Sequence, residues 1–165
     1  MTVCEESFKN GMRYLGAAVH IVTTADGDAW AGLTATAVCS LSAQPPRLLA
    51  CINRRGITFE TVTKARNLAV NLLCDDQISI AQRFAGMMQE DENDRFDKGL
   101  WAAGQSGAPI LKSALVSFDC QVEQIIDGGT HAIVIGNVVD VLQNQQNKGP
   151  LIYLDGQWGQ VHTNP

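Results

Sequence analysis

The sequence predicts a mainly β fold with flanking helices, in which an antiparallel sheet closes into a small barrel. Runs of β-branched and alternating apolar residues recur about seven times along the chain. The segments between them are mostly too short for parallel crossovers, which favours antiparallel pairing. Since a sheet of this size usually removes its edges by closing, we expect a barrel with helices packed outside it. The length of 165 residues predicts a single domain over 1–165.

The N-terminal third reads as one helix followed by three strands. Apolar residues at i, i+4 and i+7 predict an amphipathic helix over 7–16. Residues 17–24 form a β-branched run, and Asp26-Gly27 predicts a hairpin turn into a second strand over 30–39. Two prolines end that strand, and 47–53 is the next one.

Two short helices and a polar excursion are expected in the middle of the chain. Thr58 is predicted to cap one helix, and Asp75 to cap another that ends at Gly86. Between them, 68–74 reads as a buried strand. Residues 87–98 are rich in acids and lack periodicity, which predicts a solvated loop or lid.

The last third carries the clearest β pattern. Residues 117–124 alternate apolar and polar side chains, so one face is expected to be buried. The Asp127-Gly128-Gly129 turn leads into a long strand over 130–142, and 151–154 is a further strand.

Composition excludes several classes of function. The net charge of −5 is opposite to what a nucleic-acid-binding domain needs. The chain contains no apolar run long enough to cross a bilayer, and the first ten residues lack the pattern of a signal peptide. The five cysteines include no C-x-x-C pair, and neither they nor the histidines have metal-ligand spacing. We therefore expect a cytoplasmic protein with no metal site, no nucleic-acid partner and no membrane partner.

Several common catalytic motifs are absent. The chain lacks the dinucleotide-binding and phosphate-loop glycine patterns, the H-E-x-x-H zinc motif and the G-x-S-x-G nucleophile motif. If the protein is an enzyme, a bound cofactor is therefore expected to carry out the reaction while the chain positions it.

Residues 31–40 are unusually small for a strand. They are rich in alanine, glycine and hydroxyl side chains, and Thr34, Thr36 and Ser40 recur at even spacing on one expected face. Small residues in a strand mark the close approach of a ligand or of another backbone. This segment can thus bind a long polar ligand such as a ribityl phosphate, or pack tightly against a helix.

Asn53-Arg54-Arg55-Gly56-Ile57-Thr58 runs from a strand into a helix start. Free backbone N–H groups, the helix dipole and two arginines favour an anion there. The alternative is a solvated loop with Thr58 as a helix cap. His131 opens a strand after a glycine turn, where it has either a functional or a structural role.

In combination, these segments resemble the short-chain flavin reductases, and most closely the group around the reductase component of 4-hydroxyphenylacetate 3-monooxygenase. The resemblance covers essentially the whole chain and rests on the order and spacing of its motifs. They are AAVHIVTT, GLTATAVCS with the PP that follows, CIN, AVNLL, QRFAG, RF at 95–96, GAPIL, SFDC and GTH.

The resemblance implies an antiparallel split β-barrel that binds FMN or FAD, assembled as a homodimer with the flavin near the subunit interface. It implies reduction of the flavin by NADH, or by NADPH, and release of reduced flavin to a separate oxygenase. His131 is the implied catalytic residue and helps to place the nicotinamide. The implied flavin-binding residues are Leu33, Thr34, Ala35, Thr36, Ser40 and Leu41 at the ring and ribityl chain, Asn53, Arg54, Arg55, Gly56 and Thr58 at the phosphate, and Phe84 and Ala85 against the flavin.

Two positions depart from the family pattern. Relatives often carry serine at the position of Gly56, and the Asp155-Gly156-Gln157-Trp158 tail replaces a more basic one. Two other functions are compatible with the same motifs. One is a flavin-binding electron carrier that does not turn over NAD(P)H, and the other is a reductase of another acceptor, such as a corrinoid or a ferric chelate.

Overall fold

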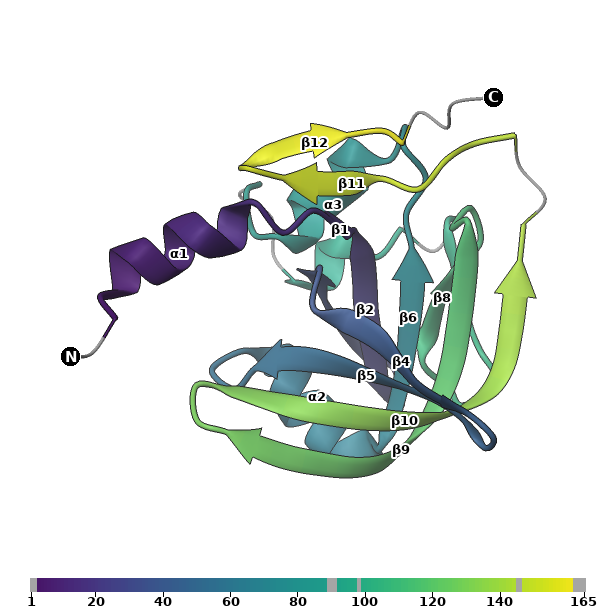
Figure 1. The fold of residues 1–165 in the computed structure, drawn as a ribbon. Helices are drawn as coiled ribbons and strands as arrows, with labels where there is room; N and C mark the ends of the chain where they lie inside the picture. Colours follow the sequence, from purple (N-terminus) through teal and green to yellow (C-terminus); the bar gives the residue numbers. More distant parts are fainter. Residues whose placement is uncertain (1–2, 89–91, 98, 145–146, 162–165) are drawn as a thin grey trace.

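The computed structural model describes residues 3–88, 92–97, 99–144 and 147–161, and within these it is mainly β (Figure 1). The helices are α1 (Glu5–Arg13), α2 (Ile57–Ala65), α3 (Ile78–Phe84) and the single 3₁₀ turn η1 (Glu92–Arg95). The strands are β1 (Ala17–Ala18), β2 (His20–Asp26), β3 (Ala29–Ala35), β4 (Val38–Ala43), β5 (Pro46–Asn53), β6 (Asn67–Leu72), β7 (Trp101–Ala103), β8 (Pro109–Leu111), β9 (Val116–Gly128), β10 (His131–Gln143), β11 (Ile152–Leu154) and β12 (Gln157–Gly159).

Seven strands form the main sheet, in the order β3-β2-β6-β9-β10-β5-β4. Every pair in it is antiparallel, as the short connections predicted. β3 and β4 end the sheet on its two sides, and no ladder joins them among the described residues, so the sheet is not closed. The physical reason is that β4 turns back to pair with β5, which leaves β3 as a free edge.

The strand predicted over 30–39 is in fact two strands. The chain bends at Thr36-Ala37, where the Val38 N–H donates to the Thr36 carbonyl at 3.0 Å. β3 then pairs with β2, whereas β4 pairs with β5 on the other side of the sheet. Residues before and after the bend therefore do not share one face, contrary to the even spacing read from the sequence.

Both predicted helix caps are wrong. The residue before α2 is Gly56, no side chain caps this helix, and Thr58 is buried in its first turn. α3 follows Gln77, also without a side-chain cap, and Asp75 instead donates its backbone N–H to the Gly149 carbonyl. In both cases tertiary packing, not a local capping side chain, sets where the helix begins.

The excursion predicted over 87–98 is partly buried. Phe96 packs at 5.0–5.5 Å between ring centroids against Trp30, Phe84 and Trp101. The prediction of a solvated loop is therefore wrong at Phe96. Residues 89–91 and 98 lie outside the described part of the chain.

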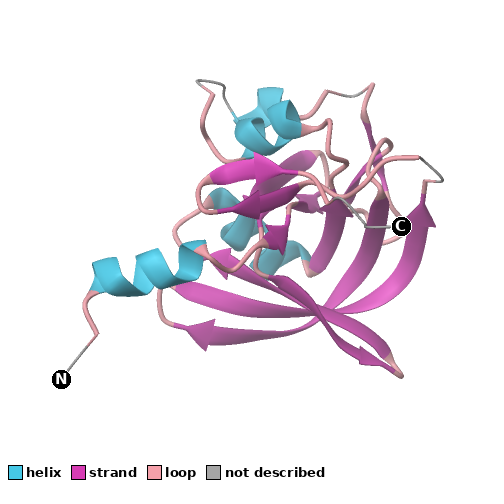
Figure 2. Ribbon diagram, turned by 45° about the horizontal axis from the view of Figure 1, so that its top comes forward, coloured by secondary structure: helices cyan, strands magenta, loops and turns pink. Residues whose placement is uncertain are grey.

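Two apolar clusters hold the helices to the sheet. One lies between the sheet and α2 and includes Val22, Ile52 and Val62. The other gathers around α3 and the small β1-β11-β12 sheet, with Phe84 and Leu151 at its centre. Both views show α1 projecting away from this body, and none of its residues is buried (Figures 1 and 2).

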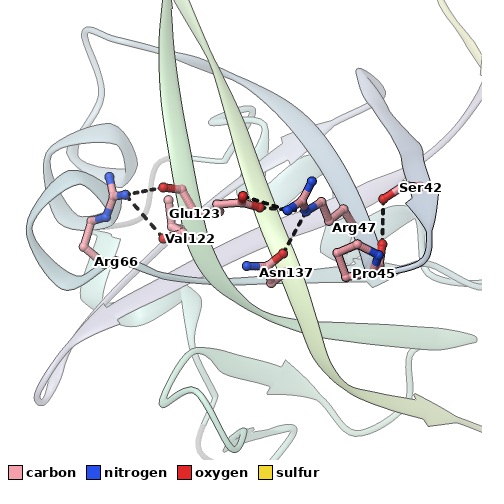
Figure 3. A network of polar contacts seen from close by, with 7 residues as sticks. All are labelled: Ser42, Pro45, Arg47, Arg66, Val122, Glu123 and Asn137. Atoms are coloured by element: carbon pink, nitrogen blue, oxygen red, sulfur yellow. Dashed lines mark hydrogen bonds and ion pairs between the residues drawn. The ribbon is translucent and has the colours of Figure 1, made fainter.

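A polar network ties three strands together at one end of the main sheet (Figure 3). Arg47 on β5 donates to Asn137 on β10 at 3.1 Å and forms an ion pair with Glu123 on β9 at 2.8 Å. Arg66, just after α2, donates to the backbone carbonyls of Val122 and Glu123. This end of the sheet is thus fixed by side chains from elements far apart in the sequence.

Candidate functional site

A pocket of about 360 Å³ lies where the end of β3, the end of α3 and the start of β10 meet. β5 contributes to its wall between them, because Asn53 is paired with His131 at the end of the β5–β10 ladder. Most of the residues predicted to bind a cofactor line it. The lining residues are Leu33, Thr34, Ala35, Thr36, Ala37, Cys51, Asn53, Phe84, Ala85 and His131.

The small residues of β3 serve the helix and the pocket in different ways. A Cβ at Gly32 would lie 3.0 Å from the Phe84 ring, so glycine lets α3 approach the strand closely. The Thr34 hydroxyl donates to the Ala81 carbonyl of α3 at 2.6 Å. Close packing against a helix, one of the two interpretations of this segment, therefore accounts for Gly32 and the Thr34 hydroxyl, while residues 33–37 form the pocket wall.

Ser40 and Leu41 do not reach this pocket. Because of the bend at Thr36-Ala37, Ser40 lines a different cavity, which it shares with His20 and Arg47. Leu41 is an exposed residue of β4. Their expected contact with a ligand in the pocket is not supported by this arrangement.

The loop from β5 into α2 provides an open helix start beside the pocket. Asn53 shapes it, since its Oδ1 accepts from the Arg55 N–H at 3.0 Å. The first N–H groups of a helix have no acceptor within the helix, and here no side chain caps them. The Arg55 side chain is exposed, with no hydrogen-bond or ion-pair partner among the residues that the structure describes. This combination of donors and a free guanidinium fits the phosphate of a cofactor.

Arg54 is directed elsewhere. Its Nη1 lies 2.7 Å from Asp127 Oδ1 and 3.2 Å from the Gly129 carbonyl, and its guanidinium lies over the Phe59 ring. Gly56 leaves open space, because a Cβ there would have its nearest neighbour, a backbone carbonyl oxygen, at 4.0 Å. Thr58 points into the core and takes no part in this loop.

His131 is the first residue of β10 and is exposed. Its backbone is paired with Asn53 of β5 and Gly128 of β9, and its Nδ1 lies 3.0 Å from the Thr130 hydroxyl. Apart from Cys51, it is the only titratable side chain that lines the pocket in the described chain. The pocket is therefore poor in acid–base groups and suits a cofactor that carries the chemistry itself.

Sequence reasoning missed Ala37 and Cys51. Cys51 belongs to the CIN segment, but a half-buried cysteine in a strand carries no local signal of a pocket. No group of three or more potential metal ligands gathers anywhere in the described residues.

Comparison with known proteins identifies the class. Residues 12–162 match the family described as the flavin reductase like domain. The chain is 40% identical over 154 residues to FMN reductase (NADH) RutF 2 of Rhizobium rhizogenes, which covers 93% of this chain and 87% of that one. It is also 40% identical over 151 residues to FMN reductase (NADH) RutF of Agrobacterium fabrum, covering 92% of this chain and 85% of that one.

Solved structures agree. A Haemophilus somnus protein assigned as a flavin reductase has a TM-score of 0.90 and 38% identity, covering 96% of this chain and 100% of its own. BorF, the flavin reductase component of a bacterial two-component tryptophan halogenase, has a TM-score of 0.88 and 25% identity, covering 98% and 100%. The chain belongs to the flavin reductase family, and it is an oxidoreductase enzyme.

The described helices include none with the length and apolar character needed to span a bilayer.

Proposed function

We propose that the protein is an NADH:FMN oxidoreductase that supplies reduced flavin to a separate oxygenase. The observation that carries this proposal is the pocket lined by His131 and Asn53, because Asn53 leads directly into the loop with the free Arg55 and the uncapped start of α2. Relatives at about 40% identity carry the name FMN reductase (NADH), which supports the choice of FMN and NADH over FAD and NADPH.

The residues of the pocket divide into three roles. The backbone of 33–37 and the ring of Phe84 form the wall against which a flat ring system packs. Arg55 and the first N–H groups of α2 bind the flavin phosphate. His131 orients the nicotinamide, which needs a positioned hydrogen-bonding group and no strong acid or base.

Bound flavin would supply the redox chemistry, accepting a hydride from the nicotinamide. The chain contributes orientation, because hydride transfer requires the two rings to lie face to face. An open pocket also allows the flavin to leave, as a supplier of reduced flavin requires.

The assembly that we propose is a homodimer with the split-barrel form of the family. α1 supports it, since Phe8, Met12 and Leu15 are exposed on a helix that buries nothing in a single chain. A groove of about 980 Å³ beside α1 shares Thr36 and Ala37 with the flavin pocket, so a second copy seated there would adjoin the site. Light scattering coupled to gel filtration tests this, with a monomer as the contrary result.

We place the protein in the cytoplasm, because all five cysteines are free thiols, as a reducing compartment favours. The partner that receives the reduced flavin is a separate oxygenase component. BorF supports this choice, since it is itself one component of a two-component halogenase system. We treat 1–165 as one flavin-binding domain.

The decisive experiment is a steady-state assay of NADH and NADPH oxidation with FMN and with FAD. The proposal predicts the highest kcat/KM with NADH and FMN, and loss of bound flavin on gel filtration. Tight flavin retention with no NADH oxidation would instead identify an electron carrier.

A further inference from the structure

We propose that Arg54 and Asp127 are a positioning pair that fastens the turn before His131 to the loop before α2, leaving Arg55 as the arginine that binds phosphate. The effect that we expect on kcat rests on the proposed function. The contact between the two loops does not depend on it. The sequence left the two arginines equivalent. Their surroundings make them different.

Arg54 connects the two loops through both its backbone and its side chain. The Arg54 N–H donates to the Thr130 carbonyl at 3.1 Å. Its guanidinium donates to Asp127 Oδ1 at 2.7 Å and to the Gly129 carbonyl at 3.2 Å. Residues 127, 129 and 130, the segment directly before His131, are therefore all held by Arg54.

Asp127 holds the same turn from the other side. Its Oδ1 also accepts from the Gly129 N–H at 2.7 Å, so one carboxylate oxygen joins the guanidinium to the turn backbone. The Gly129 N–H and then the Arg54 charge hold the pKa of Asp127 below its usual value. The pair thus stays charged throughout the neutral pH range.

The turn needs such a support because glycines make it pliable. Gly129 has a φ of 84°, in the left-handed region that glycine adopts readily. Gly128 lies close to the His131 carbonyl, where a Cβ would approach to 2.9 Å. Arg54 holds Asp127, Gly129 and Thr130 against the end of β5. These contacts fix the position of His131 at the start of β10, and therefore the position of its ring relative to the pocket.

The same contacts make Arg54 a poor phosphate ligand. Its charge is balanced by Asp127, whose carboxylate would repel a second anion at that place. Its flat face covers Phe59 with 5.7 Å from the guanidinium carbon to the ring centroid. Arg55, one residue further on, is exposed and carries none of these contacts in the described chain.

The test compares Arg54→Met, Asp127→Asn and Arg55→Met, with Glu123→Gln as the matched control. Glu123 also pairs an arginine of β5 with β9 across β10, but at the other end of the sheet. We expect Asp127→Asn and Arg54→Met each to lower kcat about threefold to tenfold. The FMN Kd, measured from flavin fluorescence, should change less than about twofold in both. Glu123→Gln should leave kcat unchanged.

The double variant Arg54→Met/Asp127→Asn sharpens the result. Because the two groups act as one unit, it should be no slower than the worse single variant. If Arg54→Met raises the FMN Kd as much as Arg55→Met and leaves kcat unchanged, Arg54 binds phosphate and the inference is wrong.

A measurement without turnover separates this inference from the proposed function. In wild-type protein the Arg54 amide is bonded to Thr130, so its hydrogen exchange should be slow, and Asp127→Asn should speed it at least about fivefold. Unchanged exchange overturns the positioning role even if the enzyme is active. Faster exchange in a protein that fails to oxidise NADH supports the pairing and overturns only the proposed function.

Discussion

The two ends of the β5–β10–β9 ladder are built alike and serve different purposes. At each end an arginine pairs across β10 with an acidic residue of β9. Arg47 of β5 pairs with Glu123 at one end, and Arg54, which directly follows β5, pairs with Asp127 at the other. The two ends are about 20 Å apart, which is the length of β10 between His131, paired with Asn53, and Asn137, paired with Arg47. Each end also carries a histidine close by, His20 at the Arg47 end and His131 at the Arg54 end.

What differs is the surroundings of each pair. Arg47 and His20 line an apolar cavity of about 310 Å³ with Leu48, Phe118 and Val138. Arg54 and His131 lie beside an open pocket, with the free Arg55 and an uncapped helix start next to them. An arginine–carboxylate pair across a sheet is thus no sign of function by itself. The open donors and the room for a ligand beside it are what indicate a site.

The largest expected effect concerns His20. Its side chain is largely buried, and burial lowers its pKa to about 4, while the nearby backbone of Ala35 and Ala18 opposes this by raising it. Because the folded pKa lies below the unfolded one, the unfolded state binds more protons between pH 6.5 and 4. This contribution to stability is complete above pH 6.5 and falls as the pH drops through this window, by about 3 kcal/mol in all.

Urea unfolding of wild type and His20→Phe from pH 7 to pH 4 measures this effect. The His20→Phe variant should lose less stability over that window than wild type. Parallel stability curves for the two proteins would show that His20 is not the group concerned.

His131 should affect turnover and leave stability largely unchanged. His131→Ala is expected to lower NADH turnover roughly tenfold to a hundredfold, about 1–3 kcal/mol of barrier, because the nicotinamide loses its orienting group. FMN binding should survive, since the proposed phosphate contacts are made by Arg55 and the start of α2 and not by His131. Stopped-flow reduction of FMN by NADH checks this, and wild-type rates in the variant would remove His131 from the site.

Arg55 is the residue that we propose binds the flavin phosphate. Arg55→Met should raise the FMN Kd about tenfold, the effect of losing one charge-assisted hydrogen bond. Riboflavin, which has no phosphate, serves as the control ligand, and its affinity should be the same in both proteins. An equal loss of affinity for riboflavin would mean that Arg55 contacts the ring system and not the phosphate.

The smallest effect is expected at the Arg47 end. Glu123→Gln weakens a half-exposed ion pair and should lower the free energy of unfolding by less than about 1 kcal/mol. FMN binding should not change, because no residue of this network lines the pocket proposed to bind flavin. A raised FMN Kd would show that the two ends of the ladder are coupled.

Much of the fold was accessible from local patterns. The existence of β9, the hairpin between β2 and β3, and the existence of three helices all follow from side-chain spacing within a few residues. The burial of β9 does not follow its alternation, because Asp119, on the face expected to be exposed, is fully buried. The starts of α2 and α3 could not be predicted in this way, because the residues before them, Gly56 and Gln77, provide no capping side chain. Phe96 was also missed, since it lies in an acidic stretch and is partly buried by three aromatic rings, Trp30, Phe84 and Trp101.

The site divides in the same way. Leu33 to Thr36, Asn53, Phe84, Ala85 and His131 were predicted from motifs and come together in one pocket. Ser40 and Leu41, which the family resemblance placed at the flavin, follow a bend in the chain and do not line this pocket. Thr58, which the resemblance placed near the phosphate, is buried in the first turn of α2.

The amino-acid order alone indicated where most strands of the main sheet lie, which residues are small enough to border a pocket, and that two arginines lie in the loop before α2. Those properties depend on side chains within a few positions of one another. Only the tertiary structure decided which arginine is free, because Asp127 lies 73 residues beyond Arg54 and meets it through the pairing of three strands. Charge partners across a sheet are set by strand register, and register is a property of the assembled sheet.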